Sequence, residues 1–337
     1  MKIGLLTSVI FNNIGNAFID LGAEATIKSA MPEAKIVKVS SYANFAATMG
    51  FTFRLKENPI VYWLWSRVMQ KFVKQLHDKT YVTVEGHSVF SPAKVAKVDY
   101  LIVPGCVLTK AYMVIYGKLL KEKVDHGCKI IFWGASGNYY TKEEIAEVSK
   151  WLEILKPYAI CTRDSVAFKH YSSYSRNVFN GIDNVFFVNR LGLPKVETTI
   201  DPYIAINFDE PKHKKIGEDL KEKYGKEHVV VTNHKPTPFV TVNKLVKKDV
   251  MVSEYPLDYL FVYNNTTETH TDRVHACIPT LSFGNSAQLY SDSPRIALFE
   301  NAGLDLAELK SKPTKIDQVK LKELQNKQIE FLKSILL

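Results

Sequence analysis

Short apolar runs alternate with longer stretches of helical periodicity along most of the chain. This alternation is typical of α/β proteins with parallel sheets. In the first half we expect strands at 2–9, 35–39, 100–103, 129–133 and 159–162, and helices near 22–30, 112–125 and 142–155. In the second half we expect strands at 203–207, 229–232, 250–253 and 260–263, followed by a helix after Thr271. The pattern therefore predicts two α/β units in succession.

The alternation breaks between Phe187 and Pro202, where a glycine and prolines interrupt the periodicity. We place the boundary there and predict an N-terminal Rossmann-like domain at 1–195 and a C-terminal one at 196–337. Apolar residues recur at helical spacing through 316–337, so a terminal helix should pack back on one of the domains. A chain of 337 residues is long for a single core, which agrees with two domains.

The composition is that of a folded globular protein, with 46% hydrophobic and 12% aromatic residues. The four cysteines are scattered without a CxxC pair, which favours reduced thiols over disulfides or a zinc site. No grouping of His, Cys and carboxylate residues has metal-ligand spacing, so we predict no metal. No run reaches the roughly 18 apolar residues of a membrane span. We expect a cytoplasmic protein, at most peripheral at the inner face of a membrane.

The formal net charge of +9 favours acidic partners such as phosphorylated molecules, anionic lipid or nucleic acid. Much of the excess comes from lysines dispersed over segments that resemble solvated helix faces. Because no nucleic-acid motif is present, we expect no nucleic-acid partner. Residues 60–74 are aromatic and basic. They predict either a helix at a membrane surface or, the interpretation that we prefer, a helix packed on the N-terminal domain.

The most informative chemistry lies at 264–276, where a polar loop leads from an apolar run into the expected helix. Thr271 can cap that helix and Asp272 suits its first turn, which leaves other backbone N–H groups free for an anion. Arg273 can bind a carboxylate or phosphate with two parallel hydrogen bonds, and His275 offers a titratable imidazole. This segment therefore suits an anionic ligand.

The geometry of a helix limits how Arg273 and His275 can act together. Residues two apart on a helix point about 200° from one another, so the two side chains can share a ligand only at the end of the helix. Pro279 should bend this helix, because it lacks the N–H that would bond the His275 carbonyl. The alternative is that His275 packs under the loop and Arg273 pairs with a surface acid.

Further candidates follow other expected strands, at the edge where ligands of open α/β sheets gather. Three of them have a structural alternative: a plain turn at 13–16, a helix cap formed by an Arg163–Asp164 pair, and a surface position for the histidine. The candidates are Asn13, Gly15 and Asn16 after the first strand, Ser136 and Asn138 after 129–133, Arg163 after 159–162, and His234 after 229–232.

The pattern T-D-R-V-H-A at 271–276, followed by L-S-F-G-N at 281–285, resembles the polysaccharide pyruvyl transferase family, as do N-I-G-N at 13–16 and R-D at 163–164. The resemblance implies a GT-B-like α/β fold in which two Rossmann-like domains face a cleft. It implies transfer of the enolpyruvyl group of phosphoenolpyruvate onto hydroxyls of a glycan sugar as a ketal, with release of phosphate, in cell-surface polysaccharide biosynthesis. Phosphoenolpyruvate would be a co-substrate with no further cofactor, and the acceptor would be a glycan or a lipid-linked saccharide.

The resemblance also implies roles for the candidate residues. In catalysis, His275 would be the general acid and Arg273 an anion clamp. Donor contacts would come from Arg163, Thr271, Asp272, Val274, Gly284, Asn285 and His234. Acceptor contacts would come from Asn13, Gly15, Asn16, Ser136 and Asn138. Two other functions remain open on the same architecture: a GT-B glycosyltransferase that uses a nucleotide sugar, and a non-catalytic protein that binds a glycan or a lipid surface.

Overall fold

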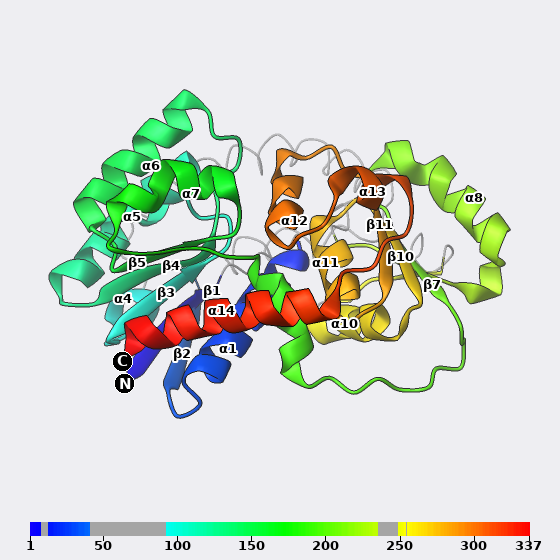
Figure 1. Cartoon of the computed structure of the whole chain (residues 1–337), viewed down its shortest axis with the longest axis horizontal. Coiled ribbons are helices and arrows are strands. Elements are labelled where there is room, and N and C mark those ends of the chain that lie inside the picture. Colours follow the sequence, from blue (N-terminus) through cyan, green and yellow to red (C-terminus); the bar gives the residue numbers. More distant parts are fainter. Residues whose placement is uncertain (8–12, 41–91, 235–248, 254) are drawn as a thin grey trace, which may run out of the picture.

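The computed structural model of the chain describes residues 1–7, 13–40, 92–234, 249–253 and 255–337. Two parallel β-sheets lie side by side and are flanked by helices (Figure 1). Within these residues the first sheet has the strand order β2-β1-β3-β4-β5-β6, and the second has the order β11-β10-β7-β8-β9. The paired strands in both sheets run parallel. The predicted α/β class is confirmed.

The strands of the two sheets have the following bounds. The first sheet contains β1 (Lys2–Thr7), β2 (Lys35–Ser40), β3 (Tyr100–Pro104), β4 (Lys129–Ala135), β5 (Ala159–Thr162) and β6 (Asn177–Asn180). The second contains β7 (Ile204–Asn207), β8 (Val229–Thr232), β9 (Val250–Met251), β10 (Glu268–Thr271) and β11 (Ser286–Leu289).

The helices of the first domain are α1 (Gly15–Ala30), α4 (Pro92–Val95), α5 (Lys110–Asp125), α6 (Lys142–Leu155) and α7 (Ser165–Tyr171), with the 3₁₀ helices η1 (Ser172–Tyr174) and η2 (Asn184–Leu191). The second domain has α8 (Lys214–Tyr224), α10 (Pro256–Asn265), α11 (Val274–Ser282), α12 (Leu298–Asn301) and α13 (Leu306–Ser311), with η3 (Pro211–His213), η4 (Lys226–His228) and η5 (Pro294–Ala297). The terminal helix is α14 (Gln318–Leu336).

The inner strands β1, β3, β4 and β5 of the first sheet are largely buried on both faces, which explains their nearly continuous apolar sequences. Along β4 the side chains alternate between two cores. Ile130 and Phe132 join the core formed with α5 and α6, whereas Ile131 and Trp133 join the core formed with α1, η2 and α14. The sheet therefore forms the middle layer of a three-layer domain.

One apolar core runs from the first sheet into the second domain. It joins Trp133 of β4 with Tyr259 of α10 and Ile278 of α11. The 3₁₀ helix η2 contacts both α1 and α11. The close approach of η2 to α1 requires a residue without a Cβ atom at position 22, because a Cβ on Gly22 would lie 1.8 Å from the carbonyl oxygen of Asn184. A continuous apolar seam therefore fixes the two domains against each other.

The terminal helix α14 crosses from the second domain back to the first (Figure 1). At its start, Gln318 Nε2 donates to the carbonyl of Leu281 at the end of α11, at 2.8 Å. Further along, the buried Gln328 accepts from Ile182 N at 2.8 Å and donates to Ile182 O at 3.3 Å. Phe331 stacks on Trp133 with a centroid distance of 6.2 Å. The predicted packing of a terminal helix back onto a domain is confirmed.

The expected strand at 260–263 is wrong, because these residues belong to helix α10. Pro256 occupies its first turn, where a missing N–H costs nothing. Tyr259, Leu260 and Tyr263 are buried, whereas Phe261 is 47% exposed. Buried residues at spacings of one, three and four belong to one helical face. A short apolar run does not by itself distinguish a buried strand from a buried helix.

The expected polar loop before Thr271 is in fact strand β10, which lies in the interior of the second sheet. Thr271 ends this strand and does not cap the following helix, which begins at Val274 with Arg273 as its N-cap residue. The helix is irregular at His275, where φ is −85° and ψ is 15°. This is the residue whose carbonyl loses its hydrogen-bond donor to Pro279, so the predicted bend is present.

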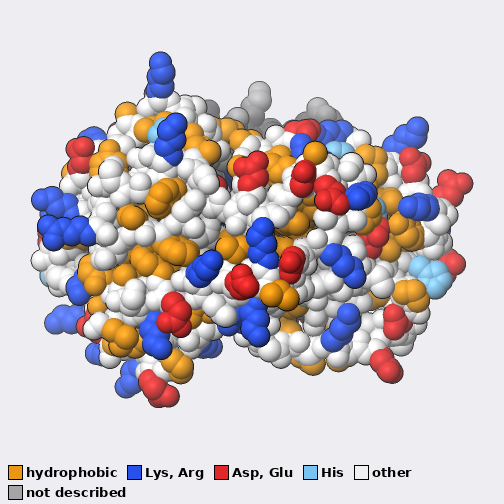
Figure 2. Space-filling model, in the orientation of Figure 1, with side chains coloured by type: hydrophobic (Ala, Val, Ile, Leu, Met, Phe, Trp, Pro, Cys, Tyr) orange, Lys and Arg blue, Asp and Glu red, His pale blue; other side chains and the backbone are white. Residues whose placement is uncertain are grey.

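Strands β6, β10 and β11 were not expected, because their polar residues interrupt or replace the apolar run that indicates a buried strand. The boundary placed after residue 195 falls between β6 and β7 and stays a prediction. Residues 60–74 lie outside the described part of the chain. In that part, no helix is long and apolar enough to cross a membrane. On the face shown in Figure 2, Lys and Arg side chains are dispersed among acidic ones.

Candidate functional site

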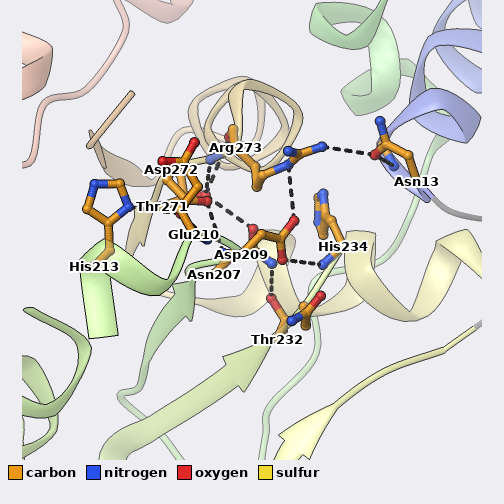
Figure 3. A network of polar contacts seen from close by, with 12 residues as sticks. Asn13, Asn207, Asp209, Glu210, His213, Thr232, His234, Thr271, Asp272 and Arg273 are labelled. Atoms are coloured by element: carbon orange, nitrogen blue, oxygen red, sulfur yellow. Dashed lines mark hydrogen bonds and ion pairs between the residues drawn. The ribbon is translucent and has the colours of Figure 1, made fainter. Parts of the chain in front are cut away.

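The second sheet has its topological switch point between β7 and β10. The chain leaves β7 for β8 on one side, and β10 lies on the other. Ligands of open α/β sheets bind in the crevice at the carboxyl ends of strands at such a point. Asp209 follows β7 and Arg273 follows β10, and Arg273 Nε lies 3.2 Å from Asp209 Oδ2 (Figure 3). Arg273 thus lies where the topology favours a ligand, paired with a nearly buried acid.

The first domain reaches this crevice through the turn that precedes α1. Arg273 Nη2 donates to Asn13 Oδ1 at 3.3 Å (Figure 3), and the backbone N–H of residue 14 donates to the carbonyl of His234 at 3.2 Å. A Cβ added to Gly15 would lie 2.9 Å from His275 Cβ. Asn16 is nearby, with its Oδ1 3.5 Å from Asn13 Nδ2. Predicted site residues from both domains therefore meet here.

Thr271 and Asp272 directly precede Arg273, and their side chains form hydrogen bonds with other groups of the protein. The Asp272 carboxylate accepts from the backbone N–H groups of residues 209 and 210 at 3.1 and 2.8 Å, and it lies 2.9 Å from His213 Nδ1 (Figure 3). Thr271 Oγ1 accepts from Arg273 N at 2.8 Å. Both side chains are buried. Their hydrogen bonds fix the backbone that carries Arg273.

Gly284 and Asn285 lie at the opposite end of α11 from Arg273. Asn285 Nδ2 donates to the carbonyls of Tyr263 and Asn264 at 2.9 and 3.0 Å, so it ties α11 to α10. The 9 residues of α11 separate the two ends by about 13 Å. The structure does not bring these two residues to the crevice. Val274, in contrast, directly follows Arg273 and so lies at the end of α11 that is next to the crevice.

His275 faces a buried ion pair of the first domain. Arg163 Nη1 donates to Asp183 Oδ2 at 2.5 Å, and Arg163 Nε donates to Ser136 Oγ at 2.9 Å. The same Asp183 oxygen lies 3.7 Å from His275 Nε2, which is too long for a hydrogen bond. Arg163 is 2% exposed and Asp183 is fully buried. Arg163 thus already has a carboxylate partner, and its predicted contact with a donor stays a prediction.

The charges in this cluster shift one another's ionisation. Burial opposes the ionisation of Asp183, but Arg163 and then His275 hold the pKa of its carboxyl well below the usual value. Burial lowers the pKa of His275, and the Asp183 carboxylate only partly offsets this. His275 is therefore mostly neutral at pH 7. The alternative pairing of Arg163 with Asp164 is wrong, because Asp164 caps α7 by accepting from Ala167 N at 2.7 Å.

A cavity of about 110 Å³ lies beside Arg163, between the two domains. It is lined by the predicted acceptor residues Ser136 and Asn138 from the first domain and by Arg295 from the second. Arg295 Nε and Nη2 both donate to Asn138 Oδ1, at 3.1 and 2.8 Å. Arg163, which was predicted to contact the donor, thus lines the same cavity as Ser136 and Asn138, which were predicted to contact the acceptor.

His234 lies behind Arg273 and is 1% exposed. Its Nε2 lies 2.6 Å from the hydroxyl of Tyr263, and its ring makes edge contacts with Phe18 and Tyr259. Nδ1 makes no hydrogen bond within the described residues. Burial, with smaller effects from Arg273 and His275, lowers the pKa of His234 well below its usual value. His234 is therefore a neutral interior residue next to the crevice.

We expect acid to destabilise the protein partly through His234. Its pKa is lowered in the folded state, so below about pH 6.5 the unfolded chain binds a proton that the folded chain does not. The free energy of unfolding lost through this proton is zero above that pH, and it grows by at most about 1.4 kcal/mol for each pH unit below it. His234→Gln should therefore lose less free energy of unfolding than the wild type between pH 7 and pH 5, measured by urea denaturation. The control His126→Gln, at an exposed position, should keep the wild-type dependence, and equal losses in all three proteins would contradict the assignment.

Four polar residues of the site were missed in the sequence: Asp183, Asp209, His213 and Arg295. Asp209 and His213 follow an expected strand, so the strand-end rule that selected Arg163 could have found them. Asp183 and Arg295 follow β6 and β11, the strands that gave no clear pattern. Among the described residues, no group of three or more His, Cys, Asp or Glu side chains could hold a metal ion.

The fold of this chain is similar to that of many solved structures, of which two are described here. MnaA of S. aureus in complex with UDP matches with a TM-score of 0.50 and 11% identity, over 99% of this chain and 91% of that one. A protein from Listeria monocytogenes assigned as a UDP-N-acetylglucosamine 2-epimerase matches with a TM-score of 0.52 and 9% identity, over 99% and 90%. No family model and no curated protein matches this chain. The GT-B-like fold, with two Rossmann-like domains facing a cleft, is confirmed.

The predicted membership of the polysaccharide pyruvyl transferase family is wrong. The similar structures are a UDP complex and an assigned UDP-N-acetylglucosamine 2-epimerase, and no family model supports pyruvyl transfer. The findings therefore do not support phosphoenolpyruvate as the donor, and the role of His275 as the acid that protonates phosphoenolpyruvate no longer applies. The short motif at 271–276 does not by itself define the family. Thr271 and Asp272, two of its polar residues, are explained by hydrogen bonds within the protein.

Proposed function

We propose that this protein binds a nucleotide sugar between its domains and cleaves the bond between the anomeric carbon and the nucleoside diphosphate. The observation that carries the proposal is the position of Arg273 at the switch point of the second sheet, within reach of the first domain. Two proteins of similar fold support the choice of ligand, one bound to UDP and one assigned to a UDP-sugar reaction. Glycosyl transfer and epimerisation through elimination both begin with this cleavage.

The start of α11 suits the diphosphate. The backbone N–H groups of Val274 and His275 donate to no described residue, and a helix N-terminus carries a partial positive charge. Arg273 adds a guanidinium that can bind two phosphate oxygens at once. Its present partners, Asp209 and Asn13, would be replaced or joined by the ligand. Arg273 therefore acts in this proposal as the clamp for the departing diphosphate.

His275 is the proposed general base. Its lowered pKa leaves it neutral at pH 7, so it can accept a proton from an attacking hydroxyl or from the sugar. The ring lies between Gly15 and Asp183 at the contact of the two domains. Arg273 and His275 both lie at the start of α11, the end of the helix at which the two side chains can share a ligand, so a sugar held by the diphosphate at Arg273 would lie near this ring.

Titration of the protein with UDP and UDP-N-acetylglucosamine by calorimetry tests the proposal. We expect Arg273→Ala to weaken UDP binding by about ten- to a hundredfold, since a hydrogen bond to a charged group contributes about 1.5–3 kcal/mol. The matched control is Arg176→Ala, because Arg176 is exposed and precedes β6 at the amino edge of the first sheet. Absence of UDP binding by the wild type at millimolar concentration, or equal binding by Arg273→Ala, would contradict the proposal.

The proposal includes a cytoplasmic location. All four cysteines, Cys106, Cys128, Cys161 and Cys277, are free thiols, as expected in a reducing compartment. Fractionation of cells that express the protein tests this location and also a peripheral association with the inner membrane face.

A further inference from the structure

The side chains that line the cavity between the domains carry several hydrogen-bond donors without a partner among the described residues. Arg163 uses Nε and Nη1, but its Nη2 donates to no described residue. Arg295 uses Nε and Nη2 on Asn138, and its Nη1 is likewise unused among the described residues. The Ser136 hydroxyl accepts from Arg163 and keeps its own proton to donate. Asn138 Nδ2 is a further donor without a described partner.

The side-chain acceptors of the lining, in contrast, are already used. Asn138 Oδ1 accepts twice from Arg295. The Asp164 carboxylate accepts from Ala167 N at 2.7 Å and from the Tyr140 hydroxyl at 2.9 and 3.0 Å. The Tyr140 oxygen itself accepts from Gly137 N at 3.0 Å. A group that enters the cavity would therefore meet donors and few free acceptors.

The charge of the lining agrees with this asymmetry. The carboxylate that balances Arg163 is Asp183, which is fully buried and does not line the cavity. No described carboxylate lies within ion-pair distance of Arg295, whose described partner is the neutral Asn138 amide. The lining thus carries two guanidinium groups, Arg163 and Arg295, and one carboxylate, Asp164, and Arg295 has no acidic partner among the described residues.

We infer that this cavity binds a carboxylate or phosphate group on the sugar that enters the cleft. Such groups accept hydrogen bonds and, when ionised, donate none, which matches the free donors of the lining. A cavity of about 110 Å³ has room for one such group and not for a whole nucleotide. The inference rests on the proposed function and adds an acidic sugar as the substrate class. The acidic group belongs either to the sugar of the nucleotide sugar or to the acceptor.

Calorimetric titration of the full chain tests the inference in two arms. The first compares UDP-glucuronate with UDP-glucose, which differ by a carboxylate at C6. The second compares glucuronate with glucose, both in saturating UDP and without nucleotide. We expect the acid to bind at least about tenfold more tightly than its neutral counterpart in one arm. Preference in the first arm places the group on the nucleotide sugar, and preference in the second places it on the acceptor.

The variant Arg295→Gln should reduce that preference to within about twofold, and Arg176→Gln should preserve it. Arg295 is exposed, so its replacement leaves the core intact. Equal binding of acid and neutral ligands by the wild type, or a preference that survives in Arg295→Gln, would overturn the inference. If the wild type binds no UDP, the proposed function fails, and the arm without nucleotide still decides whether the cavity selects an acid.

Discussion

Replacing Arg163 by methionine is expected to lower the free energy of unfolding by about 3–5 kcal/mol. The substitution leaves the Asp183 carboxyl fully buried without the guanidinium 2.5 Å away that holds its pKa down, so the group must stay charged without this partner or take up a proton. Removing one partner of a buried pair costs more than the pair contributes, because the remaining charge stays desolvated. Urea denaturation followed by circular dichroism measures the loss.

Two variants make this prediction specific. Arg163→Met combined with Asp183→Asn removes both charges, and the asparagine can still accept the hydrogen bond from Val185 N at 2.8 Å. This double variant should recover part of the loss. Arg176→Met, at an exposed position, should change stability by less than about 0.5 kcal/mol. A loss below 1 kcal/mol in Arg163→Met, or a double variant less stable than the single one, would refute the role given to the pair.

Replacing His275 by glutamine should reduce turnover by about 10²–10⁴-fold, while UDP affinity stays within twofold of wild type. Glutamine fills similar space but cannot accept the proton. Turnover is measured as UDP release from the UDP-sugar that the wild type accepts. A variant that loses UDP affinity instead would show that His275 binds the ligand and does not act as the base.

The pH profile gives a second test of the same role. A general base must be unprotonated, and burial lowers the pKa of His275 below its usual 6.5. Wild-type kcat should therefore be constant above about pH 7 and fall as the pH drops below the lowered pKa. The residual activity of His275→Gln should lack this acidic limb. A wild-type profile that instead rises toward low pH would assign the opposite proton transfer.

Much of the fold could be predicted because strong patterns reflect burial. Strands β5 and β8 and helix α6 have the expected bounds, since each has an apolar face or run with clear ends. Helix α10 was mistaken for a strand because its apolar run is too short to distinguish the two periods. Strand β10, with the sequence ETHT, is stabilised by its neighbours β7 and β11 and not by its own apolar residues.

The site was harder to predict because its contacts join distant parts of the chain. The position of Arg273 at the start of a helix could be inferred locally, as could the turn at Asn13, but strand β10 before Arg273 could not. Asp183 partners a residue 20 positions away, and Arg295 contacts Asn138 across 157 positions. No local rule reveals such pairs without homologous sequences or a structure. The local rules therefore found groups that could bind an anion but not the charges that already surround them.

The chain passes between the domains twice, once before β7 and once along α14 (Figure 1). Two covalent crossings restrict relative movement far more than one, because they leave free rotation only about the line that joins them. Entry of a bulky substrate would then proceed by rocking of the second domain about this line. Such rocking would separate Arg295 from Asn138 and Arg273 from Asn13, whereas the glutamine contacts of α14 with the first domain would persist. Opening the cleft would thus break these two polar contacts between the domains, whereas the apolar core that the domains share would resist their complete separation.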